Sequence, residues 1–167
     1  MNAGPFLLEI MQALRTARLE AILIGNAGAA LRGAPVTTQD FDFLIRPSPQ
    51  FRAKVARLAE ILHASVSTPY YPVSNVVRLR NQNGLIIDLL PRMSAIRSFE
   101  SLRSRSDTIR MGDESMRIAS LDDIVRSKRA AGRPKDLAVL PILEEVLREQ
   151  KAAAKGSTEG SPRRRRR

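Results

Sequence analysis

The sequence DFDFLI at residues 40–45 constrains the fold more than any other part of the chain. Its aromatic and aliphatic residues are typical of a core strand. Because successive side chains of a strand point to opposite faces, Asp40 and Asp42 project together while the two phenylalanines enter the core. The segment therefore predicts a sheet that carries two carboxylates in a row on one face.

A pair of carboxylates on a partly buried strand is costly, because like charges repel and burial disfavours the ionised forms. A divalent cation between them is the simplest remedy, and the alternative is a solvated strand end. The chain has no cysteine and one histidine, which excludes thiolate sites and cysteine nucleophiles and disfavours zinc. Oxygen ligands alone indicate Mg²⁺ or Mn²⁺.

A third carboxylate, Asp88, interrupts the apolar run at residues 85–90. A charge inside a core strand needs a polar partner. If this strand lies beside the Asp40 strand, the three carboxylates can hold two metal ions, which clamp the attacking and leaving oxygens of an in-line phosphoryl displacement. The structural alternative is an ion pair between Asp88 and Arg78 on a neighbouring strand.

Hydrophobic periodicity, caps and turn residues predict the other elements. Helices are expected at residues 5–18, 27–31, 48–64 and 120–131, and from Pro134 onward with a kink or break at Pro141. Ser48 and Ser120 are the expected N-caps of the third and fourth helices. Strands are expected at residues 21–24, 40–45, 76–79, 85–90, 108–111 and 116–119, the last four forming two hairpins.

This order of elements predicts an α/β (α+β) fold, with a mixed β-sheet flanked by helices and with helices at the C-terminal end. Residues 1–150 suit a single domain, and the low-complexity residues 151–167 predict a disordered basic tail. The tail carries +6 of the net charge of +11, so the domain itself is basic and suits phosphate-rich partners. The N-terminal segment, residues 1–20, resembles neither a signal peptide nor a membrane span, so a cytoplasmic protein without a membrane partner is expected.

Gly25-Asn26 lies at a predicted strand-to-helix turn. Small residues let the backbone approach a phosphate there, and free N–H groups at a helix start favour negative charge. Close packing alone is the other explanation of such a turn. A triphosphate could rest at this turn, and the turn gains weight as a signal from the Asp40–Asp42 pair that follows it.

Taken in order, Gly25-Asn26, Asp40-Phe41-Asp42 and Asp88 resemble the active-site motifs of the nucleotidyltransferase superfamily. The segment from Ser120 to Asp136 resembles the C-terminal signature of minimal and abortive-infection-type toxin nucleotidyltransferases. The resemblance covers about residues 5–145 and implies a nucleotidyltransferase-like domain. The chain departs from the pattern at Asn26, where the family usually has glycine or serine.

The resemblance implies roles for these residues. Asp40, Asp42 and Asp88 would bind Mg²⁺ (or Mn²⁺), Gly25 and Asn26 would seat the phosphates of a nucleoside triphosphate, and Lys128 and Asp136 would assist the triphosphate and the reaction. Arg133 is expected, as an alternative to Lys128, to neutralise the charge that develops. From the residues alone, Asp136 is equally well a charge at a helix N-terminus, and the basic residues are equally well a solvated helix face.

The expected function is magnesium-dependent transfer of a nucleoside monophosphate, for instance from ATP, to an acceptor hydroxyl. The basic domain favours an RNA or tRNA acceptor, and the resemblance adds the toxin of a toxin–antitoxin pair with an antitoxin or regulatory partner. The alternative is a catalytically silent relative that binds nucleotide, RNA or a partner protein. The sequence leaves the donor base, the acceptor and the oligomeric state open.

Overall fold

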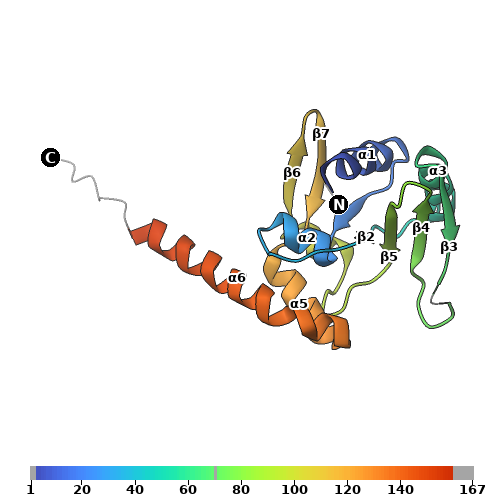
Figure 1. The fold of residues 1–167 in the computed structure, drawn as a ribbon. Helices are drawn as coiled ribbons and strands as arrows, with labels where there is room; N and C mark the ends of the chain where they lie inside the picture. The colour runs from blue at the N-terminus through green and yellow to red at the C-terminus, as the bar shows by residue number, and fades with distance from the viewer. Residues whose placement is uncertain (1–2, 70, 160–167) are drawn as a thin grey trace.

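The computed structural model describes residues 3–69 and 71–159. Figure 1 shows a twisted sheet with helices on both sides and a long C-terminal helix that extends away from the body. The helices are α1 (Ala3–Thr16), α2 (Gly25–Leu31), α3 (Phe51–Ile61), α4 (Phe99–Arg103), α5 (Leu121–Ala131) and α6 (Pro134–Glu159). The strands are β1 (Ala21–Leu23), β2 (Phe41–Ile45), β3 (Ala64–Ser67), β4 (Val77–Asn81), β5 (Ile86–Leu90), β6 (Asp107–Met111) and β7 (Glu114–Ile118).

The strands form one seven-stranded mixed sheet in the order β3-β4-β5-β2-β1-β7-β6. β2 runs parallel to β5 and β1 parallel to β7, and the other neighbours are antiparallel. Both predicted hairpins, β4–β5 and β6–β7, are confirmed. In the first, the buried Asn81 closes the turn, because its Oδ1 accepts hydrogen bonds from the backbone N–H groups of Asn83 and Leu85. The mixed α/β architecture is thus confirmed.

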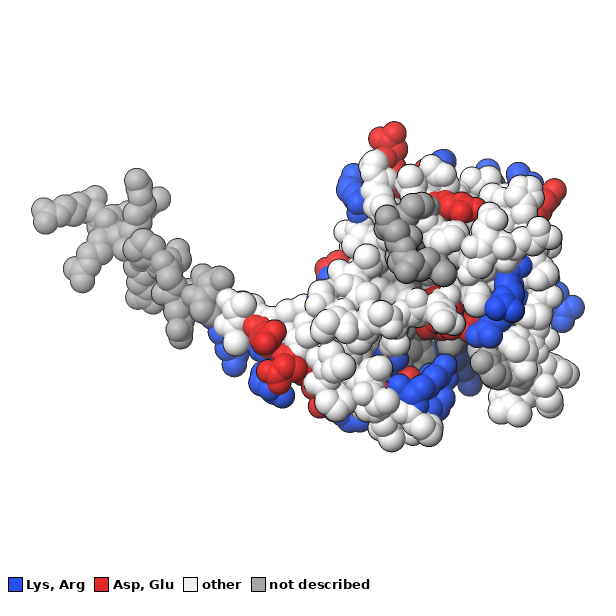
Figure 2. Space-filling view, in the orientation of Figure 1, with Lys and Arg blue, Asp and Glu red and all other residues white. Residues whose placement is uncertain are grey.

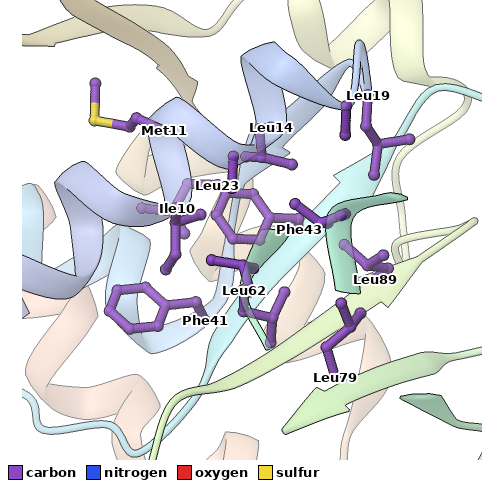
Figure 3. Close-up of a cluster of buried hydrophobic side chains, with 14 of the residues drawn as sticks. Ile10, Met11, Leu14, Leu19, Leu23, Phe41, Phe43, Leu62, Leu79 and Leu89 are labelled. Carbon is purple, nitrogen blue, oxygen red and sulfur yellow. The ribbon is translucent and has the colours of Figure 1, made fainter. Parts of the chain in front are cut away.

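The sheet separates two apolar cores. On one face α1 and α3 pack against alternate residues of the central strands around Phe43, which is fully buried (Figure 3). On the other face α2, α4, α5 and α6 pack against Ile22, Leu44 and Leu90. Because side chains of a strand alternate between faces, Asp42, which lies between Phe41 and Phe43, is on the second face.

Both ends of α5 confirm the expected capping. Ser120 is the N-cap of α5, and its Oγ accepts a hydrogen bond from the Asp123 backbone N–H at 3.1 Å. Gly132 ends the same helix in a left-handed conformation, with φ of 63°. This φ is accessible to glycine without strain. The chain can therefore turn sharply into α6, which brings the end of α5 and the first turn of α6 together.

Other predicted boundaries are wrong. The N-cap of α3 is Gln50 and not Ser48. The Ser48 hydroxyl accepts a hydrogen bond from the Gln50 backbone N–H, but Gln50 itself precedes the helix, which begins at Phe51. The helix also stops at Ile61 instead of reaching Ala64, because His63 adopts a left-handed φ of 49° and Ala64 already begins β3. Neither the edge strand β3 nor the five-residue helix α4 was predicted, because both are short and lack a clear apolar period.

The C-terminal helix also differs from expectation. Pro141 lies inside α6 without splitting it. The helix continues to Glu159, so residues 151–159, which were expected in a disordered tail, are helical, and residues 160–167 lie outside the described part. In the described part of the chain, none of the helices combines the length and the apolar character that crossing a membrane requires.

Candidate active site

A cleft of about 1130 Å³ opens on the face of the sheet that carries Asp42. Its walls come from the turn between β1 and α2, from β2 and β5, and from the junction of α5 with α6. All residues that the sequence singled out line this cleft: Gly25, Asn26, Asp40, Asp42, Asp88, Lys128, Arg133 and Asp136. Residues from four segments that are separate in sequence thus lie around one cleft.

The three carboxylates converge because β2 and β5 are neighbours in the sheet. Asp42 lies directly opposite Asp88 in the parallel register, and Asp40 immediately precedes β2. One oxygen from each carboxylate lies within 4.8 Å of the other two. Thr38 fixes the outermost of the three, since its Oγ1 donates to Asp40 Oδ1 at 2.9 Å.

Asp42 carries the electrostatic cost of this arrangement. Burial, followed by the repulsion from Asp40 and Asp88, raises the pKa of the Asp42 carboxyl to about 6, although Lys135 and Lys128 act in the opposite direction. At neutral pH the Asp42 carboxylate is thus ionised although burial and its two neighbours disfavour the negative charge. A cation held between the three carboxylates would remove this repulsion.

Arg78 supplies part of the missing positive charge. Its Nε and Nη2 donate to Oδ1 and Oδ2 of Asp88 at 2.7 and 2.6 Å, and the same Nη2 lies 3.9 Å from Asp40. Arg78 reaches Asp88 because the two residues are paired across β4 and β5. The structure thus combines both interpretations of Asp88, since the residue joins the carboxylate cluster and also forms the ion pair with its hairpin neighbour.

Position 25 requires a glycine because its backbone lies close to the Asp42 side chain. Gly25 begins α2 with φ of 65°, and a Cβ placed there would overlap the Asp42 Oδ2 and lie 2.9 Å from the Asp42 Cβ. Asn26 follows, and its Oδ1 is buried without a hydrogen-bond partner among the described residues. A buried acceptor without a partner costs free energy, which a ligand in the cleft could recover.

Asp136, in the first turn of α6, is buried and is contacted by two basic residues. Lys128 Nζ donates to Asp136 Oδ1 at 3.2 Å and Arg133 Nε to Oδ2 at 2.5 Å, while Asp136 is only 1% exposed. Burial raises the pKa of Asp136, but these two hydrogen bonds outweigh it and the net shift is downward. Asp136 therefore stays ionised and holds the Lys128 side chain at the cleft wall.

Three cations around the carboxylate cluster and the cleft were missed as site residues. Arg78 entered the sequence argument only as a structural partner, Lys135 only as part of the segment from Ser120 to Asp136, and Arg92 not at all. Lys135 and Arg92 are exposed and line the cleft. Lys135 lies next to Asp136 in the α5–α6 segment, and Arg92 closely follows β5, so proximity in sequence to the predicted residues was the available signal.

The residues present fit a divalent cation. The cluster offers three carboxylates, the oxygen ligands that Mg²⁺ and Mn²⁺ prefer. Burial first, and then repulsion from Asp40 and Asp88, raises the pKa of Asp42, and a bound cation would offset both effects. Asp40 and Asp42 are the ligands best placed for an ion, because both oxygens of Asp88 already accept hydrogen bonds from Arg78.

Known proteins resemble this chain in structure and not in sequence. No protein-family model and no curated protein sequence matches it. The structure of ANT(2'')-Ia in complex with adenylyl-2''-tobramycin is similar with a TM-score of 0.60, at 15% identity over 92% of this chain and 94% of that chain. The lincomycin-bound lincosamide antibiotic adenylyltransferase LnuA is similar with a TM-score of 0.58, at 13% identity over 84% of this chain and 95% of that chain.

A structure from Thermotoga maritima that is classed with the nucleotidyltransferases is similar over 87% of this chain and 92% of that chain, with a TM-score of 0.57 and 16% identity. These similarities span almost the whole length of each neighbour, so they concern the complete fold and not one shared motif. The chain therefore has the nucleotidyltransferase fold.

Proposed function

We propose that this protein is a magnesium-dependent nucleotidyltransferase that moves a nucleoside monophosphate from a nucleoside triphosphate to an acceptor hydroxyl. The observation that carries the proposal is the convergence of Asp40, Asp42 and Asp88 beside the Gly25 turn in an open cleft. Neighbours with the same fold include an antibiotic adenylyltransferase and a protein bound to an adenylylated antibiotic. These neighbours support the reaction class.

Each residue has a role that follows from its position. Asp40 and Asp42 would hold Mg²⁺, which would polarise the phosphate oxygens and offset the charge that develops on them. The backbone at Gly25 and Asn26 would lie along the phosphates. Lys128, held by Asp136, and Arg133 would neutralise the triphosphate from the opposite wall.

The chemistry is a single displacement at phosphorus. The acceptor hydroxyl oxygen forms a bond to the α-phosphorus, while the bond from this phosphorus to the oxygen that bridges to the β-phosphate breaks. The hydroxyl proton passes to the carboxylate of Asp88, and pyrophosphate leaves with the bonding electron pair. Asp88 keeps lone pairs for that proton because each carboxylate oxygen accepts more than one hydrogen bond.

The charges of the cleft favour an RNA acceptor over a cationic drug. Among the described lining residues every carboxylate already has a role, either in the Asp40–Asp42–Asp88 cluster or in the ion pairs of Asp136. Arg92 and Lys135 remain at the wall without such a partner among those residues. A phosphodiester chain suits them, whereas a polyamine would find no free carboxylate.

Transfer assays test the proposal directly. The protein is incubated with each α-³²P-labelled nucleoside triphosphate, Mg²⁺ or Mn²⁺, and total RNA, and label in RNA or protein is measured. We expect transfer that Asp42→Asn abolishes without unfolding the domain, and that Asp113→Asn, an exposed carboxylate in the β6–β7 turn, leaves unchanged. Absence of transfer with every nucleotide and both metals would refute the activity.

A second candidate is a silent relative that binds nucleotide without turnover. The observation that favours it is Arg78, which engages both oxygens of the residue assigned as the proton acceptor. Isothermal titration with a non-hydrolysable triphosphate separates the two functions. Binding of equal strength in the wild type and in Asp40→Asn, with no transfer in either, would favour the silent protein.

A further inference from the structure

We propose that the open sheet face, formed by Ser65 and Ser67 of β3 and by Arg78 and Arg80 of β4, binds the backbone of a single-stranded RNA and leads its end to Asp88. The chemical fate of that end rests on the proposed function, whereas the binding of RNA does not. No role in the cleft geometry above requires β3 or Arg80.

Strand register places these four residues on the same face as the carboxylates. Arg78 is paired with Asp88, and Arg80 with Ile86 two residues earlier on β5. On the next strand Ser67 is paired with Arg78 and Ser65 with Arg80. Since directly opposite residues of neighbouring strands share a face, the polar surface continues from Asp88 across β4 to the edge of the sheet.

This part of the sheet is not covered by the helices of its own face. Those helices pack against Ile22, Leu44 and Leu90, and their described core includes no residue of β3 or β4. Ser65, Ser67 and Arg80 are exposed. Figure 2 shows Lys and Arg side chains on the side of the molecule where Figure 1 places β3 and β4. The face is thus open to a ligand as well as polar.

The charge of Arg80 is available for a phosphate on the open sheet face, whereas Arg78 is already paired with Asp88. The Arg80 side chain has no ion pair or hydrogen bond within the part of the chain that the structure describes, and its exposure keeps it solvated. Ser65 donates its hydroxyl to the Arg80 carbonyl oxygen, which holds the hydroxyl oxygen on the surface as an acceptor for a ribose 2′-OH. A cation beside hydroxyl groups is typical of backbone recognition, which carries no sequence information.

The dimensions fit an extended strand. Neighbouring strands of a sheet lie about 4.8 Å apart, so β3 lies about 10 Å from β5. A single-stranded chain that enters over Ser65 and Arg80 therefore reaches the Asp40–Asp42–Asp88 cluster within a few nucleotides. Its terminal hydroxyl would arrive from the side opposite Lys128 and Arg133, which leaves that wall to the triphosphate.

Binding measurements with matched variants test the surface. The change is Arg80→Gln in the full chain, and the control is Arg110→Gln, an exposed arginine on β6 at the far edge of the same sheet. Anisotropy of a fluorescein-labelled 12-nucleotide RNA, followed as salt rises, should show about a five- to tenfold loss of affinity for Arg80→Gln. The slope of log K against log salt should fall by about 0.7 for the lost phosphate contact.

Crosslinking locates the RNA independently of affinity. Because the chain has no cysteine, Ser65→Cys can be labelled with a benzophenone maleimide at a single position, and Thr108→Cys on β6 is the matched control. We expect ultraviolet crosslinks to ³²P-labelled RNA from Ser65→Cys alone. Equal crosslinking from both positions, or equal RNA affinity of Arg80→Gln and Arg110→Gln, would refute the open sheet face as the binding surface.

The two proposals can fail separately. If RNA binds through Arg80 but no nucleotide is transferred, the proposal of the RNA-binding surface is supported and the proposed enzymatic function is refuted. If transfer to another acceptor occurs and Arg80→Gln has the wild-type affinity for RNA, the proposed enzymatic function is supported and the proposed RNA-binding surface is refuted. Nucleotide binding by Arg80→Gln, measured by titration, should equal that of the wild type, because Arg80 is not among the residues that line the cleft.

Discussion

Replacing Asp42 by asparagine should stabilise the metal-free protein at neutral pH. The pKa of Asp42 is raised from 3.8 to about 6, first by burial and then by Asp40 and Asp88. A carboxyl whose pKa is higher in the folded state favours folding while it is protonated, and this contribution is lost as pH rises from the unfolded to the folded pKa. Asparagine keeps the shape of the protonated acid and never ionises.

The size of the effect follows from the shift. One pKa unit corresponds to about 1.4 kcal/mol, so a shift of about two units gives about 3 kcal/mol at pH 7.5. At pH 5 the folded carboxyl is largely protonated and the advantage of the variant falls to about 1.5 kcal/mol. At pH 3 both states are protonated and the advantage disappears.

Urea unfolding followed by circular dichroism at pH 7.5, 5 and 3, with EDTA present, measures these differences. The comparison of wild type with Asp42→Asn at each pH cancels the titration of the other carboxyls. Added Mg²⁺ should then reverse the order at pH 7.5, because the wild type gains a bound cation and the variant loses a ligand. The reasoning is refuted if the variant is no more stable than the wild type at pH 7.5 or if its advantage is independent of pH.

Three other substitutions test the contacts around the cleft. Gly25→Ala should lower both stability and nucleotide binding, because its Cβ would overlap Asp42 and its φ is 65°; wild-type affinity in calorimetry would contradict this. Asp136→Asn should cost about 3 kcal/mol at pH 7 in urea unfolding, because it leaves a largely buried Lys128 without its partner. That cost should shrink as pH falls through the lowered pKa of Asp136. Phe43→Ala should cost about 4 kcal/mol, since Phe43 is fully buried between α1, α3 and the sheet; a melting temperature within a few degrees of the wild type would contradict the packing.

Arg78 adds a positive charge to the cluster of three carboxylates. It binds Asp88 by two hydrogen bonds and lies 3.9 Å from Asp40. The arginine thus limits the repulsion between the three carboxylates in the metal-free protein. Because β4 also carries Arg80, the same strand links the Asp40–Asp42–Asp88 cluster to the open sheet face.

The sequence by itself indicated which residues carry the candidate site. A charge inside an apolar strand is costly, so Asp42 and Asp88 stood out as residues that need a cation or a polar partner. The hairpin turns and the Ser120 cap could also be predicted from the sequence, because each depends on residues only a few positions apart. These local signals were sufficient to predict a mixed sheet flanked by helices.

Only the tertiary structure decided which residues face one another. The alternation of a strand fixes the face of Asp88, but not that β5 lies beside β2 and Asp88 opposite Asp42. Pairing over this distance depends on the packing of both apolar cores, which no local pattern encodes. For the same reason the edge strand β3, the place of Lys135 in the cleft and the raised pKa of Asp42 were found only in the folded chain, where residues distant in sequence share one environment.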